Sequence, residues 1–234
     1  MSFKEHLWKH RRGLLVSSAS VAALSLTTAA TLGGFSATIV NPNNTFASGT
    51  LQLEESLGSA SCFSAGGASP QTVTAANSFT CTTINKLGNA LKQVPGGTPV
   101  ATSVTLTNVG NLAATTDTLV AGTCSASASA DNLGFTGADV SGFCGKVDVT
   151  IDNTTPGAAD KCLYPVVSTT TACDIATSGS TGNLAALSGT SVPGLDVLGA
   201  GQSATYKFTV MLDPSATNAD QGLSANIPLT WAQT

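Results

Sequence analysis

Alternating apolar and polar residues are the main pattern of this chain after residue 34. Clear alternation, typical of half-buried β-strands, covers residues 50–54, 103–107, 146–152 and 204–212. Weaker alternation predicts strands at residues 79–84, 118–121 and 227–231. Clusters of Gly, Asn and Pro separate these segments and predict turns.

One segment has helical spacing instead. Ile84, Leu87, Leu91 and Val94 recur at intervals of three and four residues, and Pro-Gly-Gly follows them. The spacing predicts one short helix over residues 84–94.

Short strands separated by turns predict an all-β fold, namely an antiparallel jelly roll or β-sandwich with loop insertions. We expect one such domain over residues 46–234. Three stretches with few apolar residues are expected to be surface loops or insertions: 57–78, 124–145 and 156–193.

The first 34 residues predict export. Four basic residues between Lys4 and Arg12 precede an uncharged apolar run, which ends in small residues at 27–30. This order is typical of a secretory signal peptide, with a retained membrane anchor as the alternative. We expect residues 1–34 to be removed by a signal peptidase, and the remaining protein to reside in the extracellular matrix or at the cell surface.

Residues 35–45 form a strand and a linker that lack a nearby hairpin partner. Phe35, Ala37 and Ile39 occupy every second position of residues 35–40, so their side chains would share one face of a strand. The turn-forming sequence Asn41, Pro42, Asn43 and Asn44 follows. We expect the strand to pair with another copy of the protein, because its backbone groups need partners. The alternatives are that it folds back as an edge strand of its own subunit or forms no regular structure.

The charge balance bears on the partners of the exported part. Twelve acidic and five basic side chains follow the leader, and only 9% of the whole chain is charged. An acidic surface repels nucleic acid and anionic lipid. We therefore expect no nucleic-acid partner, no membrane contact after cleavage, and a neutral, hydroxyl-rich surface suited to packing against other copies.

Six cysteines all follow the leader, which is typical of an oxidising compartment: Cys62, Cys81, Cys124, Cys144, Cys162 and Cys173. Many pairings are possible. We favour pairing in sequence order, because each bond would then close a short excursion rich in Gly, Ser and Ala.

Catalytic chemistry finds little support in the sequence. No histidine follows His10, which argues against zinc sites and Ser-His-Asp or Cys-His catalysis, so we expect no enzyme activity and no cofactor. Asp148, Asp152 and Asp160 are weak candidates for calcium ligands, although their spacing matches no calcium loop. Sequons for N-glycosylation begin at Asn43 and Asn153.

Three stretches resemble the TasA/camelysin family of secreted Gram-positive proteins: NNTFASGTLQL, SVTLTNVGN and GQSATYKFTVMLDPSATNADQGLSANIPLTW. The resemblance covers both ends of the exported part and a central strand. The loops at 57–78 and 124–194, which carry cysteines, lie outside it.

The resemblance implies a jelly-roll subunit of biofilm-matrix fibres, in which the N-terminal strand of one subunit completes the sheet of the next. It also implies cleavage by a dedicated signal peptidase near Phe35, with Thr38 as the other position. Camelysin itself is described as a cell-surface metallopeptidase, and a monomeric surface or spore-coat adhesin is a third possibility. The lack of a histidine after the leader argues against transferring the peptidase activity.

Overall fold

The computed structural model describes residues 48–66, 77–90, 92–130, 132–165, 171–175 and 182–234. Residues from Ser48 to Thr234 form one unit. Its strands are β1 (Leu53–Leu57), β2 (Ala60–Phe63), β3 (Val100–Asn108), β4 (Asp117–Ala121), β5 (Ser125–Ala128), β6 (Val147–Asn153), β7 (Lys161–Tyr164), β8 (Ser191–Val192), β9 (Ser203–Leu212), β10 (Leu223–Asn226) and β11 (Leu229–Gln233). Its helical turns are η1 (Phe143–Lys146), α2 (Leu184–Leu187) and η4 (Asn218–Asp220).

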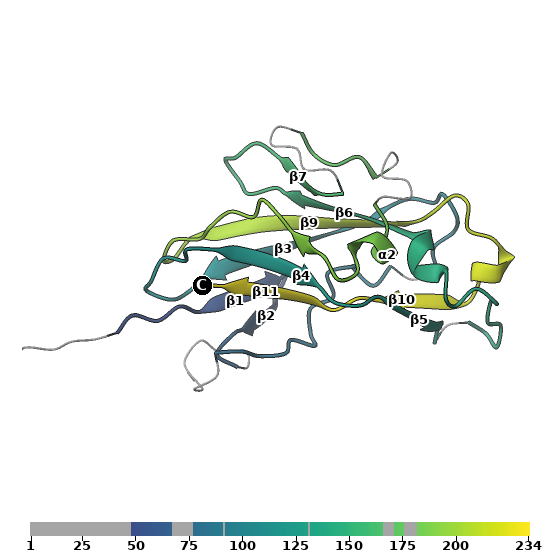
Figure 1. Ribbon diagram of the computed structural model, residues 1–234, viewed down its shortest axis with the longest axis horizontal. Coiled ribbons are helices and arrows are strands. Elements are labelled where there is room, and N and C mark those ends of the chain that lie inside the picture. Colours follow the sequence, from purple (N-terminus) through teal and green to yellow (C-terminus); the bar gives the residue numbers. More distant parts are fainter. Residues whose placement is uncertain (1–47, 67–76, 91, 131, 166–170, 176–181) are drawn as a thin grey trace, which may run out of the picture. The chain divides into compact units, whose positions relative to one another are not determined.

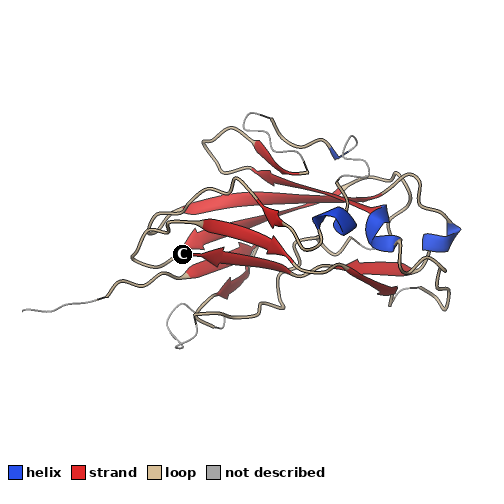
Figure 2. Cartoon of the chain, viewed as in Figure 1, coloured by secondary structure: helices blue, strands red, loops and turns tan. Residues whose placement is uncertain are grey.

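All strand pairs are antiparallel. Six strands form the larger sheet in the order β2-β1-β3-β9-β6-β7, and the smaller sheets have the orders β11-β4-β8 and β10-β5. Figure 1 shows β10 leading into β11 and β4 leading into β5, so the two smaller sheets form one broken ribbon. The all-β sandwich prediction is confirmed, and Figure 2 shows how little of the chain is helical.

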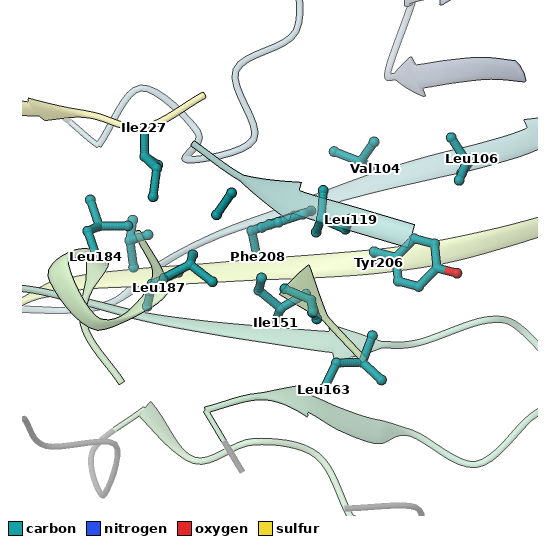
Figure 3. Packing of buried hydrophobic residues seen from close by; sticks show 14 of the residues in the cluster. Val104, Leu106, Leu119, Ile151, Leu163, Leu184, Leu187, Tyr206, Phe208 and Ile227 are labelled. Atoms are coloured by element: carbon teal, nitrogen blue, oxygen red, sulfur yellow. The ribbon is translucent and has the colours of Figure 1, made fainter. Parts of the chain in front are cut away.

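The core lies between the larger sheet and this ribbon. Inward positions alternate along β3 and β9, where Val104, Leu106, Tyr206 and Phe208 are at most 2% exposed. Leu119 of β4 packs against them from the other layer (Figure 3). Alternation therefore predicted the buried face of each long strand correctly.

The helix predicted at residues 84–94 is wrong. Gly88, Asn89 and Lys92 have φ values of 69°, 50° and 57°, in the left-handed region, which a right-handed helix excludes. Ile84 and Leu87 pack against the core from an irregular segment. The α-helix of the described chain is instead α2, whose N-terminal cap is the side chain of Asn183.

The predicted loops contain more structure than expected. The 57–78 stretch includes β2, the 124–145 stretch includes β5, and the 156–193 stretch includes β7, α2 and β8. Leu184 and Leu187 are fully buried, so the last stretch is part of the core and not a surface insertion. Conversely, the strand predicted at residues 79–84 is absent.

Candidate subunit-binding edge and groove

The ribbon formed by β10 and β11 has one edge without a partner strand. β10 pairs only with β5, and β11 pairs only with β4, within the described part of the chain. An unpaired strand edge exposes backbone donors and acceptors that can template another strand.

The register identifies the backbone groups that face away from β5 and β4. Ser129 N–H donates to Gly222 O at 2.7 Å, and Gly122 N–H donates to Pro228 O at 2.8 Å, so these pairs are hydrogen-bonded ones. Alternate residues then direct N–H and C=O to the other side. These outward-facing residues are Leu223, Ala225, Leu229, Trp231 and Gln233.

A groove of about 870 Å³ runs beside this edge. Its lining includes most of the described residues between Cys81 and Pro95, residues 220–229, and the buried side chains of Leu184 and Val210. The groove surface mixes polar and apolar groups, so it places free backbone groups beside the apolar side chains of Leu184 and Val210, which an added strand with alternating apolar side chains could contact.

The segment that contains Lys86 is fixed to the sandwich by this side chain, which also lines the groove. Lys86 Nζ lies 2.6 Å from Glu55 Oε1 of β1, and Trp231 Nε1 of β11 donates to the same oxygen at 3.0 Å. Lys86 also lies 5.9 Å from the centroid of the Trp231 ring. These contacts tie one segment to both layers.

The predicted donor strand and linker belong to the part of the chain that the structure does not describe. Phe35, Ala37, Ile39 and the linker residues 41–44 lie outside the described residues. The sequon at Asn43 lies there too. Their roles remain predictions.

The favoured cysteine pairing is confirmed. Disulfides join Cys62 to Cys81, Cys124 to Cys144 and Cys162 to Cys173. Three disulfides are typical of an oxidising environment. Among the described residues, no helix is long and apolar enough to cross a membrane.

The calcium candidates are not brought together. Asp152 Oδ2 lies 3.4 Å from Lys207 Nζ, its Oδ1 accepts the N–H of Cys173, and Asp160 is exposed. Asp152, Cys162 and Cys173 do lie close together, but the two sulfurs are bonded to each other. This group therefore offers no metal site while the disulfide is intact.

Asp148 has an unusual environment for a carboxylate. It lies on β6 and is 2% exposed, and its Oδ1 has no hydrogen-bond partner in the described chain. Burial, and then the charge of Asp213, raise the pKa of Asp148 to about 6. Its charge therefore depends on pH near neutrality.

Asn153, at the second sequon, is 1% exposed, and its Nδ2 donates to Asp196 Oδ2 at 2.7 Å. The folded protein cannot present this amide for glycosylation.

Sequence reasoning missed the free edge and the residues that surround it. Pro228 between β10 and β11 was a usable signal, because proline in a strand region marks an edge or a bulge. Lys86, a charge within an apolar pattern, was another. Their partners depend on register and could not be read from the sequence.

No protein-family model matches the chain, and no curated protein matches it. The resemblance to TasA/camelysin proteins therefore depends on the three quoted stretches and remains an expectation.

Proposed function

We propose that this protein is a structural subunit of extracellular biofilm-matrix fibres, in which copies of one chain join head to tail by exchange of the N-terminal strand.

 The observation that carries the proposal is the unpaired edge of β10 and β11, within the described part of the chain, beside a groove of about 870 Å³ that includes buried apolar side chains. The occupant we assign to it is the N-terminal strand, residues 35–40, of a second copy.

Length and chemistry support this occupant. Six extended residues span roughly 20 Å, which suits the part of the edge that lines the groove, from Leu223 to Leu229. Phe35, Ala37 and Ile39 alternate, so they can enter the groove while their backbone pairs with residues such as Ala225. The strand carries no charge, and the groove includes buried apolar side chains.

Such a contact is head-to-tail. The donor strand and the acceptor edge are different surfaces, so each added subunit leaves one of each free, and the assembly grows as a filament. The disulfides and the leader favour secretion, and the resemblance to TasA/camelysin proteins favours the extracellular matrix as the destination.

Electron microscopy of the purified chain that begins at Phe35 tests the proposal. We expect filaments from this chain, and soluble monomers after deletion of residues 35–41. Equal assembly by the truncated chain would refute strand exchange.

Two competing hypotheses are separated by the same preparation. A camelysin-like metallopeptidase would cleave casein in a manner that a chelator blocks, whereas we expect no cleavage. A monomeric adhesin would remain monomeric with its N-terminal strand intact.

A further inference from the structure

A lysine, an asparagine and an aspartate form a cluster where β6 ends and β7 begins. Asn153 and Lys161 are directly opposite each other in the β6–β7 register. Lys161 Nζ lies 3.1 Å from Asp196 Oδ1, and Asn153 Nδ2 donates to Asp196 Oδ2 at 2.7 Å. One carboxylate therefore bridges an amine and an amide from neighbouring strands.

The amide of Asn153 is held in a fixed orientation. Its Oδ1 accepts hydrogen bonds from Thr155 N at 3.1 Å and Thr155 Oγ1 at 2.6 Å. Thr155 Oγ1 in turn accepts the N–H of Thr205 at 3.1 Å, which directs the hydroxyl proton toward Asn153. Two donors on a carbonyl oxygen stabilise the negative charge that develops when a nucleophile attacks the carbonyl carbon.

We propose that Lys161 and Asn153 join in an intramolecular isopeptide bond. Asp196 accepts a proton from the Lys161 ammonium, and the neutral amine attacks Cγ of Asn153. The intermediate collapses as its C–N bond to Nδ2 breaks, with Asp196 returning the proton to the leaving nitrogen. An amide and a lysine ammonium thus become a secondary amide and an ammonium ion, with no oxidant or cofactor consumed.

The surroundings restrict water at the amide. Asn153 is 1% exposed, and it lies opposite Tyr206, which is fully buried on the neighbouring strand. Lys161 and Asp196 keep about a third of their side-chain surface exposed, at 32% and 33%. The reaction needs to occur only once in each molecule, so a slow step is sufficient.

The other ion pairs of the described chain lack this arrangement. Asp152, which pairs with Lys207, accepts a backbone N–H from Cys173, and Glu55, which pairs with Lys86, accepts the indole N–H of Trp231. Neither carboxylate holds a side-chain amide that an amine could attack. The structure therefore assigns the bond to Lys161 and makes Lys207 a matched control.

Tryptic digestion and mass spectrometry of the reduced, alkylated protein test the proposal. Trypsin cuts after free lysine, so the bond should preserve an undivided fragment of residues 147–207. Loss of ammonia should make this fragment about 17 Da lighter than its sequence. Tandem spectra should place the link between Asn153 and Lys161.

Three variants make the result specific. Lys161→Arg keeps the positive charge but removes the nucleophile, and Asp196→Asn removes the proton acceptor. Both should be cut at position 161 and show no loss of ammonia. Lys207→Arg should keep the lighter, undivided fragment. Cleavage after Lys161 in the wild-type protein, or the same mass loss in Lys161→Arg, would overturn the proposal, whether or not the protein forms filaments.

Discussion

Lys86 Nζ contacts Glu55 Oε1 at 2.6 Å although both side chains are at least nine-tenths buried. The ion pair links the irregular 81–95 segment to β1, and the indole of Trp231 completes it from β11. This ion pair therefore fixes the groove-lining segment that carries Lys86. If Lys86 is removed, the charge of Glu55 remains buried with little solvent to stabilise it.

Replacing only one member of this pair should destabilise the protein strongly. Lys86→Met leaves Glu55 buried without its cation, at an expected cost of about 3–5 kcal/mol in the free energy of unfolding. Urea denaturation measures this cost. Lys92→Met is the control, because Lys92 is an exposed lysine in the same segment, and it should change stability by less than about 0.5 kcal/mol.

A double variant separates the ion pair from the packing around it. Lys86→Met combined with Glu55→Gln should recover part of the stability lost in Lys86→Met, because no uncompensated charge remains. If the stability losses of the single variants Lys86→Met and Glu55→Gln simply add in the double variant, the two side chains are not coupled in the way their geometry implies.

The environment of Asp148 predicts a stability that depends on pH. The pKa of Asp148 in the folded protein, about 6, lies above the ordinary value of 3.8. Its contribution to the free energy of unfolding is therefore largest below pH 3.8 and is lost as pH rises through about 6. Asp148→Asn should therefore be more stable than wild type at pH 8, by about 1–2 kcal/mol. Urea midpoints of both proteins between about pH 4 and pH 8 measure the difference. If the stability difference between Asp148→Asn and wild type does not widen as pH rises, the raised pKa of Asp148 is contradicted.

Removing the Cys124–Cys144 disulfide should cost about 3 kcal/mol, because the bond closes a loop with a sequence separation of 20 and Cys144 belongs to the core. Serine at both positions tests this by thermal or urea unfolding under non-reducing conditions. Stability unchanged by the substitutions would show that packing alone orders this loop.

Proline substitution tests the free edge of β10. Ala225 and Ala126 are opposite each other in the β10–β5 pair, and each N–H faces away from its partner strand. Only Ala225 lines the groove. Ala225→Pro should abolish filaments by removing a donor for the added strand, whereas Ala126→Pro should assemble like the wild type. Unfolding curves of the monomers establish that each variant is folded, and equal assembly by the two would exclude this edge as the acceptor.

The sequence predicted the long strands well because their pattern is local. Alternation along residues 204–212 fixes which side chains of β9 face the core, whatever strands lie beside it. Helical spacing gave a wrong prediction at residues 84–94, where Ile84 and Leu87 pack against the core from a segment with left-handed φ values around Gly88.

The candidate sites depend on contacts between distant residues. Glu55 and Trp231 are separated by most of the domain, and their contact exists only because the two layers pack together. Asn153 and Lys161 are close in sequence, but a register shift between Ile151 and Asp152 decides which residues are opposite each other. No periodicity in the sequence encodes that shift.

Amide hydrogen exchange at the β10–β11 edge tests strand exchange most directly. Leu223, Ala225 and Leu229 should exchange quickly in monomers that lack residues 35–41 and slowly in filaments of the chain that begins at Phe35. Ser224 and Thr230, whose amides face β5 and β4, should be protected in both states. Equal exchange of the outward-facing amides in monomers and filaments would contradict the account.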